Sequence, residues 1–269
     1  GHRGCRLAIT YPEIYEMQVE AIARATAECE KKGFAHNVQI MIPNVVSYKE
    51  VSQIREQAEA VIAKVNEDEG LDLHFEIGTM VEFPRAALSA NKLAEYADFF
   101  SFGTNDLSQT TFGFSRDDYG KFINAYLDQH ILDDDPFKTL DPDGPGALME
   151  IAEAKGRSTN ANLHLGICGE HGGDPASIEL CYKIGLNYVS CSPFRVPLAR
   201  LAGAQAVIKT NRAAIVAKAT TAKAPAKAPA AKAPAKEVKK AAPKPAAKAP
   251  AAPAKPAAKK PAAKKTTKK

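Results

Sequence analysis

Five short apolar runs alternate with segments of helical periodicity along residues 1–212, and this alternation constrains the fold more than any other feature. The runs are residues 38–43, 73–82, 98–106, 164–170 and 188–193. Short apolar runs between helices are typical of strands buried on both faces of a parallel sheet. The sequence therefore predicts an α/β fold. Neither GxGxxG nor GxxxxGKS/T follows any run, which argues against two common nucleotide-binding folds.

The segments between the runs carry signals for helix starts. Ser47 and Glu50 predict a capping box before a stripe of apolar residues at helical spacing, and Thr10 with Glu13 predicts a second one. Asp174 stands before a proline and predicts another helix start.

Polar side chains gather at or just past the carboxyl ends of four of the runs. They are Glu82, Asn105, Asp106, Cys168, Glu170 and Ser192. A doubly wound sheet binds ligands chiefly at one switch point, whereas a (β/α)8 TIM-type barrel concentrates its chemistry at all its strand ends. We therefore predict the C-terminal five or so strands of such a barrel. The remaining strands would precede Gly1, and the chain, which has no initiator Met, is expected to be a fragment or a processed product.

Two acids and one tetrapeptide suggest a ligand site at these strand ends. Glu82 and Asp106 end neighbouring runs and could share one Mg2+, or each could cap a helix or pair with an arginine. In the segment GTND, Gly103 would let backbone approach a ligand and the Asn105 amide could donate to an oxyanion; the alternative is an ordinary turn or helix cap.

Cys168 lies between glycines in GICGEHGGD. This segment alone leaves four roles open for Cys168: metal ligand, nucleophile, proton donor or small buried residue. A zinc site would need more soft ligands than the nearby His171, and no base or oxyanion hole for a nucleophilic role is visible. Near an anionic substrate a thiol stays protonated and can give up a proton. The remaining alternative is that Cys168 is simply a small buried residue.

Four arginines are candidates for binding an anionic substrate through their positive charge. They are Arg3, Arg6, Arg85 and Arg116, and each could equally be a solvated surface residue.

Residues 213–269 differ sharply from the rest of the chain. They contain 16 Lys, no Arg and one acid, Glu237, for a charge of +15; subtraction from 36 basic and 31 acidic residues leaves 20 and 30, or −10, for residues 1–212. Frequent prolines and the scarcity of large apolar side chains predict a disordered tail. Such a tail either binds nucleic acid or another polyanion, or keeps the body in solution.

The cysteine content and the hydropathy of the chain indicate a cellular location. Five scattered cysteines without a CxxC pair favour a reducing cytoplasm, with a plastid possible in a eukaryote. No apolar run approaches the ~20 residues of a membrane span.

Five long motifs carry a resemblance to a known family. GHRGCRLAITYPEIYEMQ, IGTMVEFPRAAL, FFSFGTNDLSQTTFGFSRDD, GICGEHGGDP and NYVSCSPFRVPLARLAGAQ resemble the C-terminal barrel of the pyruvate, phosphate dikinases. Enzyme I of the sugar phosphotransferase system shares the GTND and CGE cores, and phosphoenolpyruvate synthase is a more distant relative. The resemblance covers residues 1 to about 209.

The resemblance implies a phosphoenolpyruvate/pyruvate site at the mouth of the barrel. By motif, Glu82 and Asp106 would be Mg2+ ligands and would contact substrate. Further substrate contacts would come from Gly103, Thr104 and Asn105, and from Arg3, with Arg6 as its competitor. Cys168 would move a proton at the methylene carbon of enolpyruvate.

It also implies a larger enzyme. The family interconverts ATP, pyruvate and phosphate with AMP, phosphoenolpyruvate and diphosphate through a phosphohistidine on a swivelling domain, and its members form homodimers. Residues 1–269 contain no segment resembling the phosphohistidine motif or the ATP-binding domain. We therefore expect no ATP-dependent turnover by this chain alone. The alternative is a non-catalytic truncated barrel whose basic tail binds nucleic acid or other polyanions.

Overall fold

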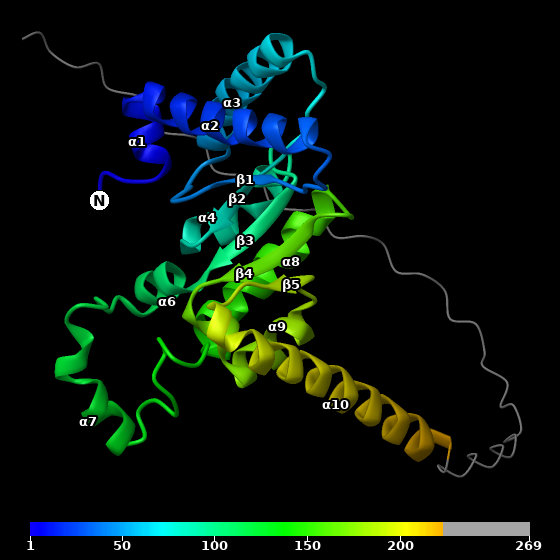
Figure 1. The fold of residues 1–269 in the computed structure, drawn as a ribbon. Helices are drawn as coiled ribbons and strands as arrows, with labels where there is room; N and C mark the ends of the chain where they lie inside the picture. The colour runs from blue at the N-terminus through cyan, green and yellow to red at the C-terminus, as the bar shows by residue number, and fades with distance from the viewer. Residues whose placement is uncertain (223–269) are drawn as a thin grey trace, which may run out of the picture. The chain divides into compact units, whose positions relative to one another are not determined.

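The structure, a computed structural model, describes residues 1–222. It contains one parallel sheet in the order β1 (Gln39–Ile42), β2 (Glu76–Val81), β3 (Phe99–Gly103), β4 (His164–Cys168) and β5 (Tyr188–Val189) (Figure 1). Each strand lies within one of the five predicted apolar runs, so the α/β fold with a parallel sheet is confirmed. Within residues 1–222, β1 and β5 are edge strands that do not pair with each other.

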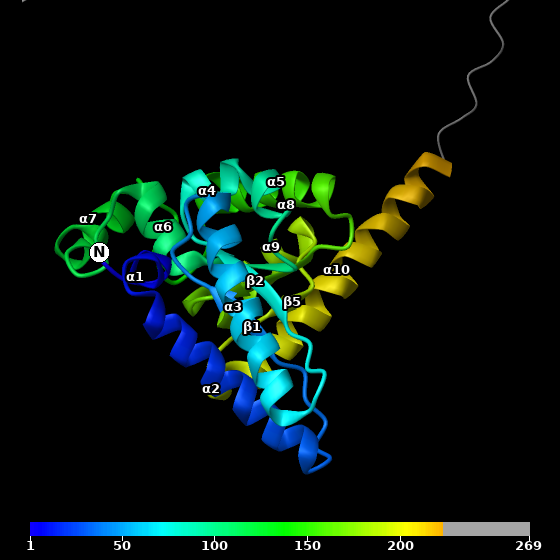
Figure 2. The same cartoon turned by 90° about the horizontal axis from the view of Figure 1, so that it is seen from above.

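Helices follow each strand in turn. The α-helices are α1 (Cys5–Thr10), α2 (Pro12–Lys31), α3 (Tyr48–Glu69), α4 (Pro84–Leu88), α5 (Ala90–Leu93), α6 (Thr104–Phe112), α7 (Ile123–Asp128), α8 (Ala147–Thr159), α9 (Pro175–Ile184) and α10 (Val196–Ala222). Short 3-10 helices are η1 (Tyr119–Lys121), η3 (Glu170–Gly173) and η4 (Pro193–Arg195), and η2 (Pro142–Gly146) is a short π-helix. Figure 2 shows α2 beside α3 near β1, while α10 lies beside α9 near β5.

The core surrounds the middle strand. All five residues of β3 are buried, and Phe100 and Phe102 are the largest side chains with no exposed surface. Leu165 and Ile167 of β4 and Ile77 of β2 are buried beside them. Burial on both faces explains why these strands are continuous apolar runs.

The helix signals are confirmed in part. Ser47 and Glu50 form a capping box at the start of α3. The box predicted at Thr10 is wrong, because Thr10 ends α1 and its hydroxyl donates to the carbonyl of Arg6 at 3.0 Å. Helix α2 starts instead at Pro12, whose missing N–H costs nothing in the first turn.

The carboxyl-terminal helix passes the predicted boundary between residues 212 and 213. Helix α10 continues to Ala222, so the first part of the predicted tail is helical here. The prediction for residues 223–269 lies outside the described residues. Among the described helices, none is both long and apolar enough to cross a bilayer.

Candidate active site at the carboxyl ends of the strands

The register of the sheet brings the predicted site residues together at one edge. Gly103, the last residue of β3, pairs with Cys168, the last residue of β4. Glu82 directly follows β2, and Asp106 lies in the first turn of α6. The backbone N–H of Cys5 donates to the Pro43 carbonyl at 3.0 Å, which fixes the N-terminal segment against the end of β1.

Two carboxyl groups and one guanidinium form the charged centre of this edge. Arg3 Nη2 donates to Asp106 Oδ2 at 2.6 Å. Glu82 is only 3% exposed, and burial, followed by the charge of Asp106, raises its pKa to about 7, against the lowering effect of the Asn44 backbone N–H. A second positive charge at this point would therefore stabilise both carboxylates in their ionised form.

Asn44 stands between the two charged partners. Its backbone N–H and its Nδ2 both donate to Glu82 Oε1, at 2.5 and 3.2 Å, and its Oδ1 accepts from Arg3 Nε at 3.0 Å. The sequence interpretation missed this residue, although Asn44 directly follows the apolar run 38–43, and Glu82 likewise stands at the end of its run.

Gly103 is required by close packing against the acid. A Cβ at this position would lie 2.7 Å from Glu82 Oε2 and 2.8 Å from Glu82 Cβ. Any side chain at Gly103 would therefore displace Glu82.

The loop after β4 is fixed to the start of α6 by His171, which is fully buried. Its Nε2 lies 3.0 Å from the Pro136 carbonyl, which can only accept, so Nε2 carries the proton. Its Nδ1, 2.7 Å from Thr104 Oγ1, then accepts from the threonine hydroxyl. Burial lowers the pKa of His171, which keeps the ring neutral.

A second contact supports the same junction. Asn105 Oδ1 accepts from the backbone N–H of Glu170 at 3.2 Å. Gly169, with φ of 130°, has no room for a Cβ, which would lie 2.7 Å from Thr104 Oγ1. The sequence prediction placed Thr104 and Asn105 at the site but did not indicate that the segment after Cys168 holds them.

Cys168 is a protonated thiol at neutral pH. Burial raises its pKa, the Ser101 hydroxyl lowers it by a smaller amount, and the charge of Glu82 raises it further. The thiol is a free cysteine of intermediate exposure. The environment favours the neutral form, as a proton donor requires.

Two hydroxyl groups near Cys168 were also missed. Ser101 is buried in β3. Burial raises the pKa of Tyr188 in β5, the Ser101 hydroxyl lowers it, and Cys168 raises it further. Gly166 makes room for the tyrosine, because a Cβ there would lie 1.9 Å from Tyr188 Cζ. The signal for Ser101 is a single hydroxyl inside the apolar run FFSFG.

Three of the four candidate arginines make contacts away from the two carboxyl groups. Arg6 lies over the Phe83 ring at 5.5 Å, and Arg116 lies over Phe137 at 5.8 Å. Arg85 Nη1 donates to the Val46 carbonyl. Arg3 is thus the candidate arginine that contacts a carboxyl group of the site, that of Asp106.

Two other polar residues at strand ends, Glu170 and Ser192, are exposed.

Glu82 and Asp106 are the residues that could hold a metal ion. Across residues 1–222, no three His, Cys, Asp or Glu side chains come together as a cation site. Mg2+ nevertheless requires only one or two protein carboxylates when substrate and water supply its other oxygens. The buried Glu82 and the half-buried Asp106 supply the oxygen donors that such an ion prefers.

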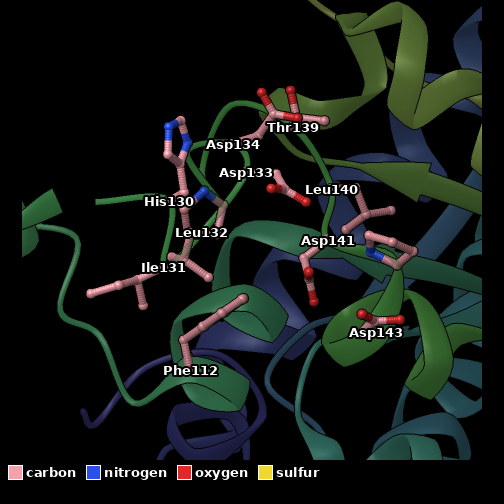
Figure 3. Close-up of a pocket in the computed structure, with 12 residues that line it drawn as sticks. Phe112, His130, Ile131, Leu132, Asp133, Asp134, Thr139, Leu140, Asp141 and Asp143 are labelled. Atoms are coloured by element: carbon pink, nitrogen blue, oxygen red, sulfur yellow. The ribbon is translucent and has the colours of Figure 1, made fainter. Parts of the chain in front are cut away.

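A separate cavity lies beside the end of α6. Its volume is about 490 Å3, and Figure 3 shows it between Phe112 and the loop that carries His130, Asp133 and Asp134. None of the predicted site residues lines it. Its acids are therefore not part of the candidate active site.

Comparison with known proteins identifies the family of this chain. The family described as PEP-utilising enzyme, PEP-binding domain, matches residues 1–208. The chain belongs to this family. Residues 1–208 correspond to its PEP-binding domain.

Similar proteins carry one name. The chain is 56% identical over 209 residues to the pyruvate, phosphate dikinase of Clostridium symbiosum, covering 77% of this chain and 24% of the relative. It is 54% identical over 217 residues to the dikinase of Rhizobium meliloti, covering 80% and 24%. The chloroplastic dikinase of Flaveria pringlei is 52% identical over 208 residues, covering 77% and 22%. The chain thus spans about a quarter of the length of these relatives.

Proposed function

We propose that this chain is the C-terminal, substrate-binding part of a pyruvate, phosphate dikinase. The observation that carries the proposal is the buried Glu82 beside Asp106 and Arg3, in a chain of the PEP-utilising enzyme family. Cys168 ends β4, which pairs with the strand β3 that precedes Asp106. The five strands would form part of a (β/α)8 barrel, because β1 and β5 both have an unpaired edge within residues 1–222 that further strands could cover.

In this proposal, Glu82 and Asp106 would hold Mg2+ at the site of phosphoenolpyruvate or pyruvate. The bound ion would supply positive charge that stabilises an enolate oxygen. Glu82 would bind in its ionised form, so binding below pH 7 would release its proton. This requirement follows from its pKa of about 7.

The anionic substrate would be bound by groups around the carboxylates. Arg3, with its side chain 58% exposed, can turn from Asp106 toward a phosphoryl group. Asn105 already uses Oδ1 as an acceptor, so its Nδ2 is the group available to donate to a substrate oxygen. Gly103 and Thr104 would contribute backbone N–H groups at the start of α6.

Cys168 would act as the acid and base. In the direction of pyruvate formation, the S–H bond breaks and its proton forms a C–H bond at the methylene carbon of the enolate. The enolate forms when the phosphoryl group of phosphoenolpyruvate is transferred to a histidine on another domain, which becomes the phosphohistidine. In the reverse direction the thiolate takes the proton back. Burial keeps the thiol protonated until the enolate is present.

The complete reaction would interconvert ATP, pyruvate and phosphate with AMP, phosphoenolpyruvate and diphosphate. It needs the ATP-binding and phosphohistidine domains as partners, and we propose a homodimer in the cytoplasm, or in a plastid in a eukaryote. The chloroplastic name of one relative supports the second location.

Ligand binding tests the proposal. Mn2+ takes the oxygen ligands that Mg2+ uses and is visible by electron paramagnetic resonance. We expect the chain to bind Mn2+ more tightly when phosphoenolpyruvate is present, and Asp106→Asn to lose about 100-fold or more, since outer-shell changes alone cost 10- to 100-fold. Equal Mn2+ binding by the wild type and Asp106→Asn would contradict the proposed site.

A second function is favoured by the separation of charge along the chain. We propose that residues 213–269, with a charge of +15, bind a polyanion while residues 1–212, at −10, do not. Counterion release makes such binding weaken steeply with salt. We expect heparin affinity to fall steeply with added salt and to disappear when residues 223–269, which follow α10, are deleted. Retention of heparin binding by the shortened chain would exclude this role of the tail.

A further inference from the structure

We propose that Asn44 is a positioning residue that sets the directions of both Glu82 and Arg3. It would thereby connect the cation-binding and anion-binding halves of the site. The inference rests on the proposed function of that site, but its structural content concerns residues of this chain only.

Both donors of Asn44 converge on a single oxygen of Glu82. The backbone N–H and the side-chain Nδ2 reach Oε1 at 2.5 and 3.2 Å. Asn44 and Glu82 are each only 3% exposed, so water does not compete well for these bonds. The two bonds fix the plane of the carboxylate.

Fixing Oε1 determines where the other oxygen points. Oε2 lies beside Gly103, where a Cβ would approach it to 2.7 Å. Gly103 is the residue before α6, whose first turn carries Asp106. Asn44 thus occupies one oxygen of Glu82 and leaves the second directed toward the other carboxylate, where a shared cation would bind.

The same amide also holds the arginine. Asn44 Oδ1 accepts from Arg3 Nε at 3.0 Å, and Arg3 Nη2 donates to Asp106 at 2.6 Å. The guanidinium is therefore bound on two sides. Because Nδ2 and Oδ1 belong to one planar amide, the orientation that serves Glu82 also serves Arg3.

The backbone at this position restricts the residue types that fit. Asn44 has φ of 61°, in the left-handed region that asparagine and glycine tolerate and other side chains rarely adopt. Its carbonyl accepts from Cys5 Sγ at 3.2 Å. Gly4 gives the side chain room, since a Cβ there would lie 2.3 Å from Asn44 Oδ1.

A purely structural reason for Asn44, the need for a left-handed residue in the turn after β1, is the competing explanation. Asn44→Gly separates the two. Glycine tolerates this φ and keeps the backbone N–H that donates to Glu82, but it removes the Nδ2 and Oδ1 contacts. Asn66→Ala is the matched control, because the Asn66 side chain hydrogen-bonds the backbone of Leu73 and touches neither Glu82 nor Arg3.

The experiment compares the full chain and both variants in three measurements. These are ligand-free crystal structures, Mn2+ affinity, and phosphoenolpyruvate affinity at saturating Mn2+. In Asn44→Gly we expect Glu82 and Arg3 to leave their wild-type orientations and both affinities to fall about tenfold or more. Asn66→Ala should lower the unfolding free energy while the folded protein keeps both affinities.

The outcomes separate this inference from the proposed function. If Glu82 and Arg3 keep their wild-type orientations in Asn44→Gly, the inference is overturned, whatever the ligands do. Wild-type affinities in Asn44→Gly would also overturn it. If the wild type binds neither ligand, the proposed function fails for this chain, and the crystal structures still decide whether Asn44 positions the two side chains.

Discussion

At the amino ends of the strands, polar side chains bond the strand backbone, whereas at the carboxyl ends two carboxyl groups lie together. Asp98, just before β3, accepts from the Ile77 N–H at 2.8 Å and pairs with Arg55 at 3.0 Å. Asn187, just before β5, accepts from the Leu165 N–H at 2.8 Å. These side chains satisfy backbone groups and join strands to each other and to helices.

The carboxyl ends use the same residue types differently. Glu82 is buried near Asp106, and its pKa is raised rather than lowered. At neutral pH, the buried Glu82 therefore lowers the unfolding free energy of the chain. Side chains that connect strands therefore lie at one end of the sheet, and the candidate site lies at the other end, where the proposed function places ligand binding.

The largest expected effect is a dependence of stability on pH that originates at the carboxyl ends. Glu82 has a folded-state pKa of about 7 against an ordinary value of 4.5. Between these values the folded chain holds a proton that the unfolded chain has released, so stability falls as pH rises and stays lower above pH 7. We expect this contribution to change by about 2–3 kcal/mol between pH 5 and pH 8, measured by urea unfolding at the two pH values.

Glu82→Gln isolates this contribution. It keeps an acceptor for Asn44 and cannot ionise, so from pH 5 to pH 8 the wild type should lose more stability than the variant. The opposite contribution of His171, whose pKa is lowered, is present in both chains and cancels in the comparison. An unchanged pH dependence in the variant would show that Glu82 titrates normally.

A smaller effect is expected from the amino ends. Asp98→Ala removes the acceptor for the Ile77 N–H and the partner of Arg55, and should lower the unfolding free energy by about 2 kcal/mol. Chemical denaturation measures this loss. Under native conditions the variant should bind Mn2+ as the wild type does, and a weaker affinity would break the proposed division between the two ends.

The smallest effect is expected for Asn187→Ala. Asn187 is exposed, so water can partly replace its bond to the Leu165 N–H. A loss of about 1 kcal/mol in the unfolding free energy is expected, with Mn2+ affinity unchanged. A loss of unfolding free energy as large as that of Asp98→Ala would show that solvent exposure does not determine how much each of these hydrogen bonds contributes to stability.

The sequence predicted the strands and two acids of the site because both depend on local pattern. Apolar runs marked β1 to β5, and the position after a strand marked Glu82 and Asp106. It could not predict that Asn44 adopts a left-handed conformation or that His171 contacts Thr104, since these depend on segments that meet only in the folded chain. The Thr10 prediction failed because the short helix α1 already contains that residue.

The contacts of the buried His171 restrict which changes of length this chain can accept during evolution. Its imidazole is the point at which the long connection between β3 and β4 returns to the site, through the carbonyl of Pro136. Upstream of that carbonyl, residues 113–134 are mostly exposed or half-buried. Insertions and deletions in that stretch should therefore be inherited without harm to the site as long as Pro136 still reaches the ring, whereas a change of length between Pro136 and α8 would move the anchor itself.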